Sequence, residues 1–156
     1  RMKSILSGLA VVSGLLAAGP PVWAGTLDDI RKSGVIRGGM RADAAPFAYA
    51  NAQGQPGGFM VELCANVTRE IARQLNMPNL RIEFLPVTTE NRIDMVRQGK
   101  IDLLCDSLTE TLDRRALVDF SITTFVDGTS FAIRNDGPQD IQKMAGKKVG
   151  AIAGTL

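Results

Sequence analysis

Apolar residues follow two patterns along this chain, and the two patterns alternate. Short apolar runs at 35–40, 80–87 and 101–105 are typical of strands. Between the first two runs, residues 58–75 carry apolar side chains at four-residue spacing, which is typical of one face of a helix. The positions of that face are Phe59, Leu63, Val67, Ile71 and Leu75. A turn at 50–58, rich in Asn, Gln, Gly and Pro, precedes this helix.

A second helix is expected between the second and third apolar runs. Thr88 or Thr89 can cap its first turn, and the helix would run through Gln98. Gly99 then stands where a helix C-terminus favours a left-handed residue. Strands and helices that alternate at this spacing predict parallel pairing with right-handed crossovers. The expected fold class is therefore α/β, with a mainly parallel sheet flanked by helices.

The alternation becomes less regular after Arg114. Residues 120–133 are expected to be extended, 138–144 to form a short helix and 147–152 a further strand. A strand followed by Gly154-Thr155 would ordinarily lead into a helix, and none follows. We therefore expect a truncated sequence, since the last unit cannot bury a core by itself. The alternative is a natural end that pairs with another chain.

The N-terminus has the pattern of a secretory signal peptide. Lys3 precedes an apolar run at 5–18, and small residues lead to an expected cleavage after Ala24, so that residues 1–24 are the signal. A membrane anchor is the rival interpretation. The run is short for a bilayer, however, and Pro20-Pro21 follows it. We therefore expect an exported, periplasmic protein.

Charge and composition exclude several functions. The formal net charge of +2 arises from the predicted signal, which holds two of the 18 basic residues and none of the 16 acidic ones. No Lys/Arg cluster supports nucleic-acid binding. The chain has no histidine, which excludes Ser-His-Asp and Cys-His catalysis and disfavours a zinc site. We expect no cofactor and no bound metal.

Two cysteines lie on predicted elements. Cys64 falls on the first predicted helix and Cys105 at the end of the third strand. Export permits a disulfide, but the pattern does not reveal whether their Cα atoms are close enough for one. Two buried free thiols are the expectation, with a bridge as the alternative.

The segment after the third strand carries groups that suit a carboxylate. Residues 107–114 read Ser-Leu-Thr-Glu-Thr-Leu-Asp-Arg. Hydroxyls, backbone N–H groups and a guanidinium would meet there, where a strand gives way to a helix. The alternative is a capped helix with a solvated arginine.

With these residues identified, the chain resembles bacterial extracellular solute-binding proteins of family 3, the amino-acid receptors of ABC importers. The resemblance is strongest to the branch that binds glutamate and aspartate, and it covers residues 26–155. It is carried by 26–36, 40–47, 58–59, 86–93, 102–107, 109, 114, 120–121, 125, 128–129 and 146–149.

The resemblance implies a periplasmic-binding-protein fold of type II, in which two lobes close on one amino acid at the carboxyl ends of the strands. Residues 25–128 would form the ligand-binding lobe 1. Residues 129–156 would form a hinge strand and the truncated start of lobe 2. The implied partner is an ABC permease in the inner membrane, and the protein is expected to be a monomer.

The resemblance also assigns ligand-binding residues by position. Arg114 would grip the ligand α-carboxylate with help from Thr109, and Ser107 would accept from the α-ammonium. Arg41 and Arg92 would hold a side-chain carboxylate. The remaining members of the expected set are Thr89 beside these arginines, Phe47 over the ligand backbone, and Thr155 at the entry to the second lobe. For Phe47, a packed loop residue is the alternative.

The placement of the three arginines supports an acidic ligand. Arg41, Arg92 and Arg114 each follow a different predicted parallel strand, so they are expected at one edge of the sheet. Three guanidinium groups fit glutamate or aspartate better than a neutral amino acid. The alternative is a set of solvated arginines without a ligand.

Two rival functions remain at this stage. Some relatives of this family dehydrate prephenate-like acids, which requires a positioned general acid or base. The nearby candidates are Asp43, Glu90, Asp106 and Glu110, and none has a histidine partner. We expect that this protein is not an enzyme and has no catalytic residue. The other rival is the sensor domain of a membrane receptor, which would need an anchor or a following transmembrane segment.

Overall fold

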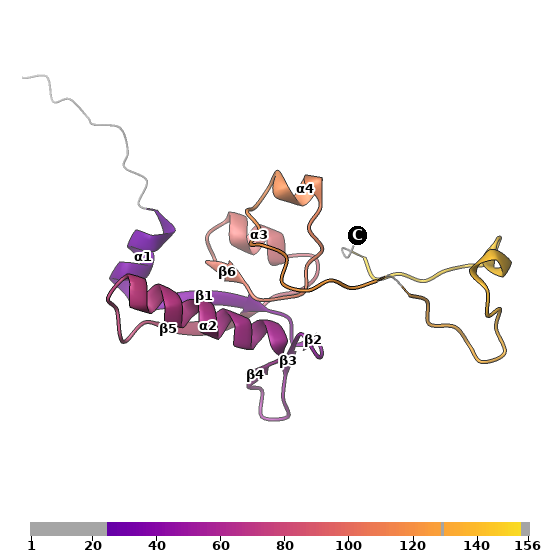
Figure 1. The fold of residues 1–156 in the computed structure, drawn as a ribbon, viewed down its shortest axis with the longest axis horizontal. Helices are drawn as coiled ribbons and strands as arrows, with labels where there is room; N and C mark the ends of the chain where they lie inside the picture. Colours follow the sequence, from indigo (N-terminus) through magenta and orange to yellow (C-terminus); the bar gives the residue numbers. More distant parts are fainter. Residues whose placement is uncertain (1–24, 129, 154–156) are drawn as a thin grey trace, which may run out of the picture.

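A three-stranded parallel sheet forms the centre of the molecule. The computed structural model describes residues 25–128 and 130–153, so the predicted signal peptide and Thr155 lie outside the described residues. The strands are β1 (Val35–Met40), β5 (Arg81–Pro86) and β6 (Leu103–Leu104), in the order β5-β1-β6 (Figure 1). Both pairs are parallel, as the alternating pattern predicts.

The third strand is shorter than its apolar run. β6 covers two residues of the predicted 101–105. Backbone pairing with β1 continues on both sides, because the N–H of Asp102 donates to Arg37 O (2.8 Å) and that of Cys105 to Gly39 O (2.7 Å). Ile101 and Cys105 are the buried ends of this run. The predicted strand is therefore present as a paired segment.

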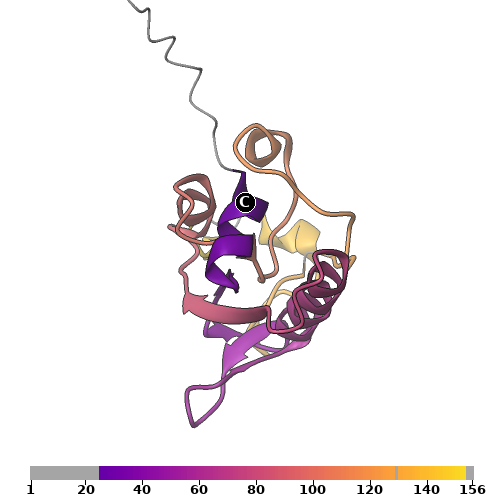
Figure 2. The same cartoon turned by 90° about the vertical axis from the view of Figure 1, so that its left-hand side faces the viewer.

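Helices cover the two faces of the sheet. α2 (Phe59–Gln74) and α3 (Arg92–Arg97) lie on opposite sides of the strands (Figures 1 and 2), and α1 (Thr26–Ser33) precedes β1. The short α4 (Leu112–Arg115) follows β6. Sequence patterns did not predict α1. They placed the start of α3 too early, because residues 88–91 form a turn in which Thr88 and Asn91 exchange hydrogen bonds.

The buried face of α2 differs from the predicted one. Its buried residues are Val61, Cys64 and Thr68, whereas Phe59 and Val67 are exposed. Apolar residues spaced by four drift by roughly 40° per step around a helix of 3.6 residues per turn. They therefore do not stay on one face. Packing against the sheet selected the stripe that lies closest to it.

A small antiparallel sheet encloses the predicted turn, whose central residues 51–55 lie outside its strands. It consists of β2 (Asp43–Ala44), β3 (Ala48–Ala50) and β4 (Pro56–Gly57) in sequence order. Asn51 closes the loop between the last two strands, accepting at Oδ1 from the N–H groups of Gln53 (3.0 Å) and Gln55 (2.8 Å).

Gly58 allows α2 to begin directly after this small sheet. Its φ is 114°, and a Cβ there would collide with the backbone of Phe47. Ala48 of β3 is fully buried and packs with Met40 and Val61, so the small sheet contributes to the core.

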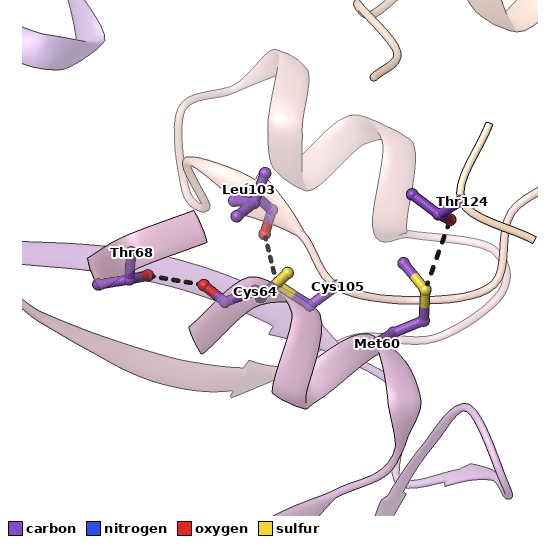
Figure 3. Close-up of a disulfide and its surroundings, with 6 residues drawn as sticks. All are labelled: Met60, Cys64, Thr68, Leu103, Cys105 and Thr124. Carbon is purple, nitrogen blue, oxygen red and sulfur yellow. Dashed lines mark hydrogen bonds between the residues drawn. A yellow bond between two sulfur atoms is a disulfide. The ribbon is translucent and has the colours of Figure 1, made fainter. Parts of the chain in front are cut away.

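A disulfide joins α2 to the end of the third strand. Cys64 and Cys105 are bonded, with their Cα atoms 6.0 Å apart (Figure 3), and the described chain contains no free cysteine. The expectation of two free thiols is therefore wrong. Both residues are almost wholly buried. The face of α2 that packs on the sheet brings them together, and this rotation about the helix axis was not readable from the sequence.

The segment after α4 does not join the sheet. No strand forms in 120–128 or 130–153, so the strand predicted at 147–152 is absent from the described residues. The predicted short helix is reduced to a 3₁₀ turn at Ile141–Met144. Apolar residues of this segment lie exposed, because no partner strand is present to cover them. The boundary between lobes at residue 128 stays a prediction.

Candidate functional site

The connections that leave the carboxyl ends of the three strands meet at one edge of the sheet. Arg41 directly follows β1, Val87 to Glu90 follow β5, and Asp106 and Ser107 follow the paired end of the third strand. A cavity of about 290 Å³ opens at this edge, lined by Arg41, Ala42, Asp43, Val87, Thr88, Thr89 and Glu90. Such an edge is the usual ligand site of open α/β sheets.

Arg41 lies in this cavity and pairs with an exposed acid. Its guanidinium contacts Asp43 at 3.0 Å, and the exposed side-chain fractions are 14% for Arg41 and 76% for Asp43. Thr89, another predicted site residue, lines the same cavity. An ion pair with one partner this exposed is weak and can be exchanged for a ligand. Arg41 is therefore placed where a ligand carboxylate could reach it.

Glu90 adds a negative charge to the same cavity. A hydrogen bond with the Thr88 side chain and one with its own backbone hold the pKa of Glu90 below its usual value. Thr89 and the positive charge of Arg41 lower this pKa further, while partial burial opposes them. Glu90 is thus ionised at neutral pH, so the cavity contains acids as well as an arginine.

Arg92 is committed to an acid of the chain itself. Arg92 is the first residue of α3, and its Nη1 donates to Asp106 Oδ2 at 2.6 Å and to Ser107 O at 3.1 Å. The exposed fractions of the two side chains are 3% and 0%. That Arg92 directly holds a ligand carboxylate stays a prediction; in the structure its Nη1 is bonded to the carboxylate of Asp106.

Arg114 lies close to this pair on the α4 side. Thr111 caps α4 by accepting from the N–H of Arg114 (3.3 Å), and the guanidinium of Arg114 donates to Thr109 O (2.8 Å). Burial lowers the pKa of Arg114, and the positive charge of Arg92 lowers it further. Two of the three predicted arginines are therefore near neighbours. The hydroxyl-bearing residues Ser107 and Thr109 lie exposed beside them.

Phe47 belongs to an aromatic cluster. Its ring lies 4.9 Å from that of Phe125 and 6.4 Å from that of Phe59, with T-shaped geometry in both pairs. The cluster attaches the segment after α4 to the lobe, which agrees with the alternative of a packed residue. A role in covering the ligand stays a prediction. Thr155 is outside the described residues.

Sequence patterns missed the role of Asp106. The sequence indicates it only as one of four acids near the site, whereas the structure shows it as the buried partner of Arg92. A charged residue directly after an apolar strand, and after a cysteine, was the available signal. Within residues 25–128 and 130–153, no cluster of three His, Cys, Asp or Glu residues could hold a metal ion. No helix in the same part of the chain is long and apolar enough to cross a bilayer.

This fold and site define the class of protein. A profile of the bacterial extracellular solute-binding proteins, family 3, matches residues 36–150, and the chain belongs to this family. The α/β lobe with its parallel sheet is the periplasmic-binding-protein fold of type II, so the predicted family and fold class are confirmed.

Particular relatives share much of the sequence. The chain is 32% identical over 99% of its length to the glutamate/aspartate import solute-binding protein of Salmonella typhimurium. It is 34% identical, again over 99%, to the L-glutamate/L-aspartate-binding protein of Pseudomonas aeruginosa. These matches cover 52% and 53% of the two relatives. The chain thus spans about half the length of the curated relatives it matches.

Solved structures agree on the fold. The ancestral amino-acid-binding protein AncCDT-1, a precursor of cyclohexadienyl dehydratase, is 34% identical with a TM-score of 0.55 over 62% of this chain and 40% of that one. The solute receptor for L-cysteine of Neisseria gonorrhoeae is 36% identical with a TM-score of 0.54 over 62% of this chain and 38% of the receptor.

Proposed function

We propose that this protein is the periplasmic solute-binding component of an amino-acid ABC importer, and that its ligand is glutamate or aspartate. The proposal is supported by the position of Arg41 and Thr89 in the cavity that follows β1 and β5, and by the Arg92–Ser107 and Arg114–Thr109 contacts in the segment that follows β6. The names of the glutamate- and aspartate-binding relatives support the acidic ligand.

Arg114 binds the α-carboxylate in this proposal. Its guanidinium is already oriented by Thr109 O at 2.8 Å, and a planar fork can hold a carboxylate through two hydrogen bonds. Ser107 and Thr109 are exposed and carry hydroxyls in the same segment. Ser107 O accepts from Arg92 and keeps a second lone pair, which can accept from the α-ammonium.

Arg41 binds the side-chain carboxylate. Its partner Asp43 is mostly exposed, so water can solvate Asp43 when the ligand replaces it. Thr89 lies in the same cavity and can donate its hydroxyl to the second oxygen of the ligand. A second lobe that closes over this edge would remove water and strengthen every one of these contacts.

The partner in this proposal is a permease in the inner membrane, and the protein acts as a monomer in the periplasm. Catalysis is not part of the proposal, although structures of dehydratase ancestors are similar to this chain. A dehydratase needs a general acid or base of suitable pKa. Glu90, with its lowered pKa, is a poor acid, and Asp106 is held by Arg92.

Isothermal titration calorimetry with the complete gene product tests the ligand. Glutamate and aspartate are expected to bind more tightly than glutamine and asparagine, since the amides lack the charge that Arg41 recognises. If none of the twenty amino acids binds, the proposal is overturned. Conversion of prephenate or arogenate by the same preparation, followed by absorbance, would establish the enzyme instead.

A further inference from the structure

The ion pair between Arg92 and Asp106 differs in burial from the exposed ion pairs among the described residues. Both side chains are almost completely excluded from solvent, and their charged atoms lie 2.6 Å apart. The pair stands at the carboxyl edge of the sheet, directly beside Ser107 and close enough to Arg114 to lower its pKa. It is therefore part of the proposed ligand site.

The carboxylate of Asp106 has fewer hydrogen bonds than a purely structural role would favour. Its Oδ2 accepts from Arg92, while Oδ1 is buried without a hydrogen-bond partner in the described part of the chain. A buried carboxylate with an unsatisfied oxygen destabilises the fold. Local costs of this kind are typical of functional sites, where a residue is kept for its role in binding.

A ligand carboxylate cannot gain much from Arg92 while Asp106 is there. Binding it to Arg92 would either displace Asp106, leaving a buried negative charge uncompensated, or place two carboxylates at one guanidinium. Both outcomes are unfavourable. Arg41 is the contrasting case, because its exposed partner Asp43 can move into water.

We propose that Asp106 sets the ligand selectivity of this protein by acting as an internal counter-ion for Arg92. It takes the place of a ligand side-chain carboxylate at Arg92, leaves the recognition of that carboxylate to Arg41, and so limits the preference for acidic over amide side chains. The inference rests on the proposed function and assigns a specificity role within the same site.

Asp106→Asn in the complete gene product tests this inference. The substitution keeps the shape and removes the negative charge, so the positive charge of Arg92 is no longer neutralised and attracts a nearby glutamate carboxylate. The ratio of glutamate to glutamine affinity, measured by calorimetry, is expected to rise by about tenfold, because only the acid gains from this charge. An unchanged or lower ratio in a folded variant overturns the inference.

Asp102→Asn is the matched control. Asp102 is also an acid with a nearly buried side chain (5% exposed), and it pairs with Arg37 at 2.6 Å. Arg37 and Asp102 line a different, larger cavity together with residues of α1, away from the carboxyl edge. The control loses a comparable ion pair, and its affinity ratio is expected to stay within about twofold of the parent. A rise equal to that of Asp106→Asn would show a nonspecific effect and overturn the assignment.

A double variant covers the case in which Asp106→Asn does not fold, as judged by circular dichroism. Arg92→Gln with Asp106→Asn removes both buried charges, which is far less costly than removing one. If Asp106 already neutralises Arg92, the affinity ratio stays within about threefold of the parent. If Arg92 binds the ligand carboxylate in the parent, the ratio falls by about tenfold and the inference is overturned.

The same measurements separate the inference from the proposed function. If the parent protein binds no amino acid, the function itself fails and the inference fails with it. If the parent binds glutamate and the single and control variants give equal ratios, only the role of Asp106 is refuted.

Discussion

An arginine–aspartate ion pair lies at each end of the parallel strands, and the two pairs differ in their hydrogen bonding. Asp102 lies next to the start of β6, and it accepts three hydrogen bonds from Arg37, through the backbone N–H, Nε and Nη2. Asp106 lies just beyond the other end and accepts one hydrogen bond from Arg92, with Oδ1 left buried. The first pair is satisfied and joins two strands. The second leaves one oxygen of Asp106 without a partner among the described residues, and it belongs to the candidate site.

This contrast shows how to separate structural from functional ion pairs in one domain. An acid whose oxygens are all hydrogen-bonded, with a partly exposed partner, stabilises the packing. It has no free hydrogen-bonding capacity for a ligand. A dry, incompletely bonded pair costs stability and changes what a neighbouring site can bind.

Removal of the disulfide is expected to have the largest effect. The bridge between Cys64 and Cys105 spans 41 residues and ties α2 to the residue that precedes Asp106, whereas the Arg37–Asp102 pair is noncovalent. Cys64→Ala with Cys105→Ala should lower the free energy of unfolding by about 4 kcal/mol, measured by urea denaturation. Mass spectrometry after alkylation without reductant checks the starting state. Two added labels would contradict the bridge.

Arg114→Ala is expected to weaken glutamate binding by at least about a hundredfold, because it removes the fork that holds the α-carboxylate. Calorimetry measures the affinity, and thermal unfolding serves as the control for folding. Equal weakening by Arg115→Ala, the next residue on α4, whose guanidinium pairs with Glu110, would contradict a specific role for Arg114.

Asp102→Asn is expected to lower stability by about 1–3 kcal/mol, since Arg37 loses its carboxylate while remaining partly exposed to water. Hydrogen bonding to Asp102 raises the pKa of Arg37 in the parent. A guanidinium stays charged at neutral pH without this help, so Arg37 must be solvated in the variant. Urea denaturation measures the change. Stability equal to that of the parent would show that the Arg37–Asp102 pair does not stabilise the fold.

Arg41→Ala is expected to reduce glutamate affinity about tenfold more than glutamine affinity, because only the acid gains a charge-assisted hydrogen bond from Arg41. Competition calorimetry gives both affinities in one preparation. Equal losses for the two ligands would remove Arg41 from side-chain recognition and leave the acidic ligand without this support.

Glu90 gives the smallest effect and concerns pH. Its pKa is lowered in the folded protein, so its hydrogen bonds to Thr88 and Thr89 stabilise the fold above the unfolded pKa, and this contribution is lost as the pH falls through the folded value. Thr88→Val should raise the pKa of Glu90, since it removes the largest cause of the shift. Carboxyl NMR titration measures the change, and an unchanged pKa would contradict the assignment.

Much of the framework was predictable from local patterns. Apolar runs predicted the positions of β1, β5 and the paired segment around β6, and the helical spacing predicted α2, because strand and helix periods differ clearly. The small sheet β2–β3–β4 was not predicted, since its strands have two or three residues and lack a period. The segment after α4 formed no strand among the described residues, because strands require partners.

The candidate site was predictable in part for the same reason. One arginine after each parallel strand predicts Arg41, Arg92 and Arg114 near one edge, which follows from the order of elements alone. Which acid each arginine meets does not follow from that order. Arg92 lies 14 residues from Asp106, and only the packing of α3 against the end of β6 brings them to 2.6 Å.

By itself, then, the sequence determined the order of strands and helices, the family, and the residues that reach the carboxyl edge, because periodicity and motif spacing are local properties. The tertiary structure alone decided the Cys64–Cys105 bridge, the buried stripe of α2 and the pairing of Arg92 with Asp106. These depend on the rotation of helices about their axes and on burial. Both are set when the whole domain packs and desolvates its charges.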